Sequence, residues 1–286
     1  MIADGKTYDF HLLPSGLLNP KCMNLIGSGT VVSVPQLFRE LSNLEEKGLN
    51  GLRERLLVSD RCHIITDLHQ QVDGLEEQEL GANNLGTTKR GIGPTYSSTA
   101  TRNGITIGEM FNETLFERKL RSLAAGYKKR YGDLMTYDIE EELSRFKAYR
   151  EDLRPLVVDA VPFMFDAQQK GMKILVEGAQ AVMLDVTYGT YPYVTSSHTV
   201  IGGAITGVSG LSPFKLSPPR SLSSSPSSSP LAYPYRHFRH NPYRCPYFGP
   251  HLRPCLYPDH RPCLCPHLPP PARPYPSHLN DLFLGY

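Results

Sequence analysis

The residues best suited to chemistry are concentrated in a glycine-rich loop, which reads GTTKRGIGPTYSSTATR from Gly86 to Arg102. Gly86, Gly91 and Gly93 lack a Cβ, so a ligand can approach their backbone N–H groups closely. Hydroxyl and cationic side chains stand among them, at Thr87, Thr88, Lys89, Arg90 and Arg102. Together these groups suit an anionic cluster such as a phosphate, although the Walker pattern G-x-x-x-x-G-K-[ST] is absent from the loop. The alternative is a surface loop whose glycines only make turns.

A second group of polar residues lies in EGAQAVMLDVTYGTYPYVTSSHTVIGGAITG, from Glu177 to Gly207. Gln180 carries an amide that can donate and accept, which suits the reading of a base edge. The hydroxyls of Thr195 to Ser197 precede a small, apolar segment. If that segment opens a helix, these hydroxyls and the free N–H groups would form an anion site; the alternative is an ordinary helix cap. Asp185 could be structural or a ligand.

Alternating strands and helices are predicted around these two segments. Alternation of apolar and polar residues predicts a half-buried strand at Lys6–Leu13. Further short strands are predicted at Thr30–Val34, Leu56–Val58, His63–Thr66 and Lys173–Val176. Helical spacing predicts helices after Ser33, over Asp67–Leu80, over 113–131 and over 138–170, the last broken or kinked at Pro155 and Pro162. This alternation predicts an α/β fold with a largely parallel, helix-covered sheet. Ligands of such sheets bind outside the carboxyl ends of strands, and Gln180 follows one such end.

The composition divides the 286 residues into two unlike parts. Residues 1–210 have the composition of an ordinary α/β domain, and their two cysteines, Cys22 and Cys62, are no disulfide framework. We find no apolar run of the ~20 residues that a membrane helix needs, and the first residues do not follow the pattern of a signal peptide. We therefore expect a cytoplasmic protein that engages no membrane and, with a formal net charge of +2, no nucleic acid.

Residues 211–286 are predicted to be a low-complexity tail. They hold 18 of the 25 prolines and four of the six cysteines, in stretches such as SLSSSPSSSP, and such a segment cannot bury enough apolar surface to fold alone. A zinc module, a proline-rich ligand and a basic nucleic-acid arm are the functional alternatives. The cysteines lack C-x₂-C spacing, and no clear basic PxxP cluster recommends a proline-rich ligand. We interpret the tail as disordered, or as the product of a frameshift or a translated intron.

The two polar segments resemble long signatures of one family. GTTKRGIGPTYSSTATRNG and VEGAQAVMLDVTYGTYPYVTSSHT are similar to those of adenylosuccinate synthetase. So are YDFHLLPSG, LIGSGTVVSVPQLFREL and SDRCHIITDLHQQVDGLEEQELG, in the family's order, and the resemblance covers residues 2 to 210. It implies an incomplete version of that family's P-loop-NTPase-like α/β fold.

The resemblance also implies an activity. Members of the family are GTP-dependent ligases of purine biosynthesis that use Mg²⁺ to join IMP to L-aspartate, giving adenylosuccinate, and they work as homodimers. Thr88 matches a threonine of the phosphate loop that contacts IMP, and Gln180 matches the glutamine of the EGAQ motif. Thr195 matches the IMP-contacting threonine of VTSS. Arg102 matches an arginine that reaches across the dimer to the partner's IMP.

Several family motifs have no counterpart in this sequence. The WGDEGKGK segment with the catalytic aspartate, the NAG-His-Thr segment with the catalytic histidine, the aspartate-binding loop and the guanine-reading Lys-x-Asp are not found. The family's order implies that the catalytic aspartate and histidine lie upstream of Met1. Thr99 replaces a lysine, and His198 replaces an asparagine. We therefore expect no catalytic residue and no metal ligand here, and no turnover by this chain alone.

Two non-catalytic functions are alternatives to the ligase. One is a protein that binds IMP or caps a full-length subunit, and the other is a scaffold that acts through its tail.

Overall fold

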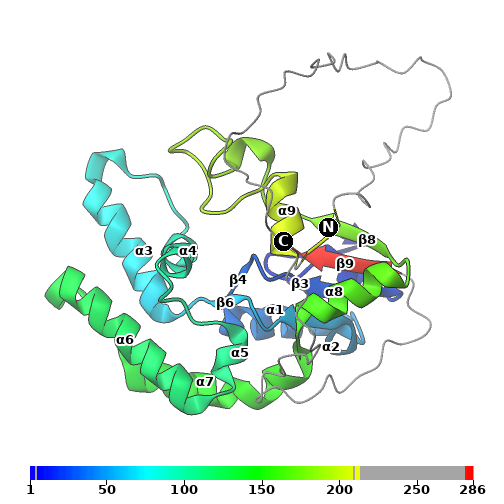
Figure 1. Cartoon of the computed structure of the whole chain (residues 1–286), viewed down its shortest axis with the longest axis horizontal. Coiled ribbons are helices and arrows are strands. Elements are labelled where there is room, and N and C mark those ends of the chain that lie inside the picture. The colour runs from blue at the N-terminus through cyan, green and yellow to red at the C-terminus, as the bar shows by residue number, and fades with distance from the viewer. Residues whose placement is uncertain (4, 209, 213–280, 286) are drawn as a thin grey trace, which may run out of the picture. The chain divides into compact units, whose positions relative to one another are not determined.

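A parallel β-sheet organises the chain. The computed structural model describes residues 1–3, 5–208, 210–212 and 281–285. The main strands are β3 (Cys22–Ile26), β5 (Leu56–Ser59), β7 (Val157–Val158), β8 (Lys173–Glu177) and β9 (Asp281–Gly285). They lie in the order β7-β5-β3-β9-β8, and each neighbouring pair is parallel (Figure 1). The α/β class with a largely parallel sheet, expected from the sequence, is confirmed.

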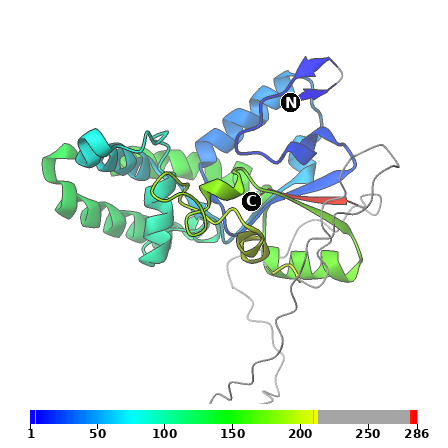
Figure 2. The same ribbon diagram turned by 90° about the horizontal axis from the view of Figure 1, so that it is seen from above.

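Helices cover both faces of this sheet or lie beside it. They are α1 (Val34–Glu46), α2 (Leu52–Arg55), α3 (Asp67–Leu80), α4 (Ile92–Ala100), α5 (Ile107–Met110), α6 (Glu113–Tyr131), α7 (Ile139–Leu153), α8 (Ala160–Gln169) and α9 (Ile201–Gly207). Short 3₁₀ turns lie at Ser15–Leu18, Gly81–Asn83, Gly132–Leu134, Arg154–Leu156 and Val182–Leu184. Figure 2 shows α1 and α8 on opposite faces of the sheet, with α3 and α6 gathered to one side.

Two small sheets accompany the main one. β1 (Ile2–Ala3) pairs antiparallel with β2 (Lys6–Thr7), and β4 (Val31–Val32) pairs parallel with β6 (His63–Ile64). The prediction of a longer strand over Lys6–Leu13 is therefore wrong for the residues after Thr7. The N–H groups of residues 11–13 donate to the carboxylate of Glu40 at 2.8 to 3.1 Å instead of to a neighbouring strand. The Glu40 side chain thus supplies the hydrogen-bond acceptors that a neighbouring strand would have supplied.

The long helix expected over residues 138–170 is two helices. Pro155 lacks a backbone N–H and ends the first, α7, after Leu153. The chain then forms β7 at the edge of the sheet, a strand that the sequence did not predict. Pro162 lies in the first turn of α8, where a missing N–H costs nothing, so it neither breaks nor ends that helix.

One apolar core joins α1, α6 and α7 to the main sheet. Leu37 and Leu41, on the inner face of α1, are both fully buried and join a cluster that also contains residues of β5, α6 and α7. The rings of Phe116 on α6 and Phe146 on α7 pack with their centroids 5.2 Å apart. Helix α3, which precedes the glycine-rich loop, packs on α6 through a second apolar cluster that contains Leu68, Val72 and Leu123.

The cysteines of the body are buried thiols. Cys22 and Cys62 are both free, as the sequence led us to expect. Burial raises the pKa of the Cys62 thiol to about 12. Among the residues that the structure describes, no helix is both long and apolar enough to span a membrane.

Strand β9 departs from the expected low-complexity tail. Residues 213–280 lie outside the described residues, so the interpretation of that stretch, its cysteines included, and the domain boundary at 210 stay predictions. Residues 281–285, however, form a strand between β3 and β8. Leu282 and Leu284 are 1% and 0% exposed. The composition of residues 211–286 as a whole hid the short apolar run Leu282–Leu284, which is typical of a buried strand.

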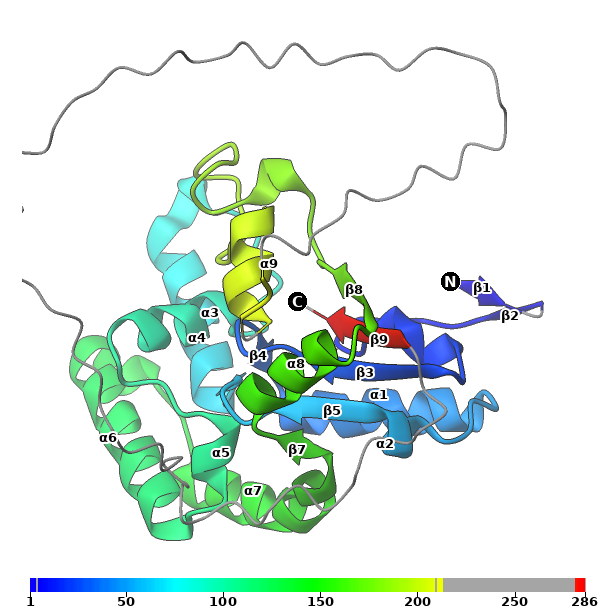
Figure 3. The ribbon, with the colours of Figure 1, turned by 45° about the vertical axis from the view of Figure 1, so that its right-hand side comes forward.

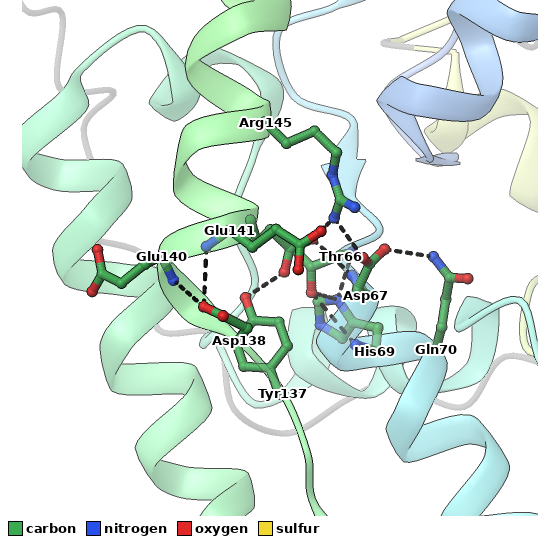
Figure 4. A network of polar contacts seen from close by, with 10 residues as sticks. Thr66, Asp67, His69, Gln70, Tyr137, Asp138, Glu140, Glu141 and Arg145 are labelled. Carbon is green, nitrogen blue, oxygen red and sulfur yellow. Dashed lines mark hydrogen bonds and ion pairs between the residues drawn. The ribbon is translucent and has the colours of Figure 1, made fainter.

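A polar network fastens α3 to α7. The buried carboxylate of Glu142 accepts the N–H of Asp67 at 2.8 Å and the hydroxyl of Tyr137. Arg145 pairs with Asp67 at 2.5 Å and with Glu142 at 3.1 Å (Figure 4). Burial raises the pKa of Glu142, and its hydrogen bonds keep this polar group satisfied inside the protein. The start of α3 is thereby fixed.

His69 completes this helix start as part of a capping box. The N–H of Thr66 donates to Nδ1 of His69 at 3.1 Å, and the N–H of His69 donates to the hydroxyl of Thr66 at 3.4 Å. Nε2 is buried without a hydrogen-bond partner. Burial, as the main cause, lowers the pKa of this imidazole to about 4.

We predict that His69 makes unfolding sensitive to acid. Because its pKa is lower in the folded state, the unfolded state binds more protons between pH 6.5 and 4, and stability falls as the pH is lowered through that window. The loss attributable to this side chain is at most about 3 kcal/mol. Urea unfolding of wild type and His69→Gln at pH 7.5, 6 and 4.5 measures it. Parallel pH profiles for the two proteins would contradict the prediction.

Candidate functional site

Two carboxylates of α3 hold the glycine-rich loop. Glu77 accepts the N–H groups of Leu85, Gly86 and Thr87 at 2.9, 2.9 and 3.1 Å. These bonds, that from Leu85 first, lower the pKa of Glu77. Asp73 accepts the hydroxyl of Thr87 at 3.1 Å and the N–H of Gly91 at 2.8 Å.

These hydrogen bonds organise the loop. They also change which of its groups are free to bind a ligand. The N–H groups of Gly86 and Gly91, expected to face a ligand, are taken by α3, so that part of the prediction is wrong for this structure. The side chains of Thr88, Lys89 and Arg90 remain exposed. Asp73 and Glu77 were missed as site residues; two acids one helical turn apart, just before a glycine-rich loop, were the signal.

Gly91 brings α4 against α3. It caps α4 with a φ of 77°, and a Cβ there would lie 2.9 Å from backbone atoms of His69 and Gln70. Both the left-handed backbone and this close approach require glycine. The first turn of α4 is thus placed beside the fixed start of α3.

Two cations of the region have an unusual backbone. Lys89 and Arg102 have φ values of 52° and 64°, and they are the non-glycine residues with positive φ among those the structure describes. Such a conformation costs a side-chain-bearing residue roughly 1–2 kcal/mol and is concentrated at functional sites. Both side chains are exposed.

Helix α4 separates the cations expected to act together. Thr88, Lys89 and Arg90 precede α4, whereas Arg102 follows it. A helix of nine residues rises about 13 Å, so Arg102 lies at the opposite end from Thr88. Thr99, in the last turn, donates its hydroxyl to the carbonyl of Thr95 at 3.0 Å.

The second polar segment begins where β8 ends. The carboxylate of Glu177 accepts the N–H and the hydroxyl of Ser15 at 2.9 and 2.7 Å. Gln180 follows three residues later, with an exposed side chain. This position, just past the carboxyl end of a parallel strand, is the one predicted for it.

Asp185 is the structural centre of this segment. Its buried carboxylate accepts the N–H groups of Thr187, Tyr188, Thr199 and Val200 at 2.8, 2.8, 2.6 and 3.3 Å. Those bonds, with that from Tyr188 the strongest cause, hold its pKa far below the usual value. Of the two roles left open for Asp185, the structure supports the structural one. His198, the replacement for an asparagine, approaches it at 3.6 Å.

The hydroxyls of residues 195–197 do not cap α9. The cap is Val200, and no side chain bonds there, so neither of the two interpretations based on a helix start holds for α9. Ser196 instead lies beside α4, because a Cβ on Gly93 would be 3.2 Å from its Oγ. Thr195 is partly exposed, and its N–H donates to the carbonyl of Leu184 at 2.8 Å.

The two polar segments therefore meet beyond the carboxyl ends of β3 and β8. The hydroxyl of Tyr96 on α4 donates to the carbonyl of Gly29, just after β3, at 2.9 Å. The N–H of Gly29 donates to the carbonyl of Gly207, at the end of α9, at 2.7 Å. Among the described residues, no group of three or more His, Cys, Asp or Glu side chains could hold a metal ion.

Met1 lies outside this meeting point and has a structural contact of its own. Its ammonium group donates to the carbonyl of Tyr8 at 2.6 Å, and the N–H of Tyr8 donates to the carbonyl of Met1 at 2.7 Å. These two bonds extend the pairing of β1 with β2, and the Met1 side chain is 60% exposed. We assign Met1 no catalytic role. The expectation that the family's catalytic aspartate and histidine lie upstream of Met1 concerns residues outside this chain, so it stays a prediction.

Fold and site together define a class: an α/β domain with a parallel sheet whose polar segments converge at the carboxyl ends of its strands. The adenylosuccinate synthetase family model matches residues 1–218. The chain therefore belongs to the adenylosuccinate synthetase family, as its motifs suggested.

Individual relatives agree with this. The chain is 63% identical over 216 residues to the adenylosuccinate synthetase of Sordaria macrospora and 62% identical over 216 residues to that of Neurospora crassa. It is 39% identical to the solved structure of the fully ligated adenylosuccinate synthetase from Plasmodium falciparum, with a TM-score of 0.68 over 75% of this chain and 50% of that one. The chain spans about half the length of the curated relatives it matches.

We predict that Glu77→Gln loosens the glycine-rich loop. A neutral amide accepts N–H groups more weakly than a carboxylate, so exchange of the amides of residues 85–87 should rise roughly tenfold. Hydrogen–deuterium exchange read by mass spectrometry measures this. Glu79→Gln, on the same helix but paired with Arg130 at the surface, is the control and should leave those amides unchanged.

The same bonds should give the loop a dependence on pH. Because the pKa of Glu77 is lowered in the fold, protection is complete above the ordinary glutamate pKa of about 4.3. It is lost as the pH falls through the lower, folded value. The same dependence of protection on pH in wild type and in Glu77→Gln, after correction for intrinsic exchange, would contradict this account of the loop.

Proposed function

We propose that residues 1–210 carry the IMP-binding side of a GTP-dependent ligase that joins IMP to L-aspartate to give adenylosuccinate. The approach of Ser196 to Gly93 carries the proposal, because it brings the two long family signatures together at the strand ends. The identity of 62–63% to two adenylosuccinate synthetases supports the reaction class. The expected cytoplasmic location stays a prediction.

Each of the four matched residues receives a proposed role. Gln180, exposed past the end of β8, offers an amide for the edge of the purine base. Thr88 and Thr195 offer hydroxyls from the two sides of the meeting point. Arg102, at the far end of α4, would reach IMP bound to the partner subunit of a homodimer.

The described residues do not fit the remaining reactants equally well. Mg²⁺ prefers oxygen ligands such as carboxylates, but Asp73, Glu77 and Asp185 already accept backbone N–H groups. We therefore assign no residue here to Mg²⁺ or to the phosphates of GTP, and we derive no step through them. What these residues can do is bind and orient IMP.

Calorimetric titration of the chain with IMP tests the proposal. We expect saturable binding that Gln180→Ala weakens by roughly 10- to 100-fold, because the base edge then loses a hydrogen-bonding partner. Gln169→Ala, which removes an exposed amide at the end of α8, is the matched control and should bind as wild type. Absence of binding at millimolar IMP, or equal effects of the two variants, would count against the proposal.

The chain by itself is expected not to turn over. Its 286 residues contain no counterpart of the family's two catalytic motifs. A phosphate-release assay with GTP, IMP, L-aspartate and Mg²⁺ should therefore stay at background, and activity of the purified chain that depends on all three substrates would refute this prediction.

A second candidate function is a non-catalytic partner of a full-length subunit. The exposed Arg102, placed by a strained backbone at the outer end of α4, favours it. Mixing the chain with an active family member should then change that enzyme's KM for IMP, and the change should vanish with Arg102→Ala.

A further inference from the structure

Strand β9 is bound within the sheet entirely by contacts distant in sequence. Each of its five residues is in register with β3 on one side, from Cys22 to Ile26, and with β8 on the other, from Lys173 to Glu177. Figure 3 shows it in red between these two strands. The last described residue before it is Ser212. Every described contact of β9 is therefore of the kind that a separate strand would make.

The surroundings of β9 are shaped for its side chains. Leu282 and Leu284 are buried to 1% and 0% exposure. A Cβ on Gly16 would lie 2.3 Å from Cγ of Phe283, so the absence of a side chain at Gly16 leaves room for that ring. The N–H of Gly27 donates to the carbonyl of Gly285 at 3.0 Å.

The residue at the end of β9 is restricted in size as well. A Cβ on Gly285 would lie 2.9 Å from Cγ of Pro14, which leaves little room for a larger residue there. The site therefore specifies a pattern of leucine, aromatic residue, leucine and glycine, and it also satisfies the backbone of the strand on both edges. Backbone pairing with pockets for alternate side chains is the chemistry by which proteins bind peptides as added strands.

β8 depends on this strand for its place in the sheet. It lies at the edge, and β9 is the strand to which it pairs. Without β9, β3 and β8 would both present unpaired backbone groups toward the same gap. An open edge of this kind is a template for another strand.

We propose that the gap between β3 and β8 is an acceptor site for a short parallel strand. Asp281–Gly285 is its exchangeable occupant, so a peptide of the same sequence can replace it from outside the chain. The occupant is this strand sequence itself; whether a second copy of the chain can also donate it is an outcome of the test. The proposal is independent of IMP binding.

The test keeps the chain intact until it has folded. A site for a specific protease replaces part of the serine-rich stretch at residues 221–229, and the folded full-length protein is then cut. A fluorescent peptide of residues 277–286 is titrated into cut and uncut protein, and anisotropy reports binding. Two further peptides serve as controls, one with the sequence scrambled and one with Leu282→Asp and Leu284→Asp.

We expect the peptide to bind cut protein saturably, with one peptide per chain. Binding to uncut protein should be at least roughly tenfold weaker, because a tethered strand competes at an effective concentration that cleavage removes. The two control peptides should not bind. Uncut protein that forms a concentration-dependent dimer, dispersed by the peptide, would also support an acceptor site and would show that a second copy can donate the strand.

Three results would overturn the proposal. One is equal binding of the native and the doubly substituted peptides. Another is a cut protein that loses its C-terminal fragment while the amides of β3 and β8 keep their protection from exchange. The third is a fragment that stays in place and is not replaced by an excess of peptide over days.

Discussion

Carboxylates accept the backbone N–H groups of three irregular segments of this chain. Glu40 holds residues 11–13, Asp73 and Glu77 hold the loop before α4, and Asp185 holds the segment that follows β8. Buried N–H groups need partners, and segments without strand neighbours have to find them elsewhere. Each of these acids accepts several polar hydrogens and so replaces a length of regular hydrogen bonding.

This arrangement decides which groups the candidate site can offer. The carboxylates use up the N–H groups of Gly86 and Gly91, so the loop offers hydroxyls and cations rather than a nest of amides. The same bonds set the course of the backbone on which Thr88 and Lys89 stand. The stiffness of the site thus comes from α3, whose own start is locked to α7 through Glu142.

The sequence predicted the parallel α/β class and the position of Gln180, because strand–helix alternation and strand ends are local patterns. It did not predict which acceptor the backbone of Lys6–Leu13 would use, since Glu40 lies far along the chain. The composition of the loop grouped Arg102 with Lys89 and Arg90, because the helical turns of α4 are hidden in a run of glycines and hydroxyls. The family resemblance alone gave Arg102 a role apart from that of Thr88. Strand β9 was missed because its apolar run of three residues, Leu282–Leu284, was averaged with a long proline-rich stretch.

The place of β9 has a consequence for the order in which the protein is made. β3 and β8 leave the ribosome well before residues 281–285 do, and they expose two open edges in the meantime. Residues 178–280 are synthesised in between, and 18 prolines lie in 213–280. Proline has no N–H to donate to a ladder, so this stretch is poorly able to occupy the gap that β9 will fill.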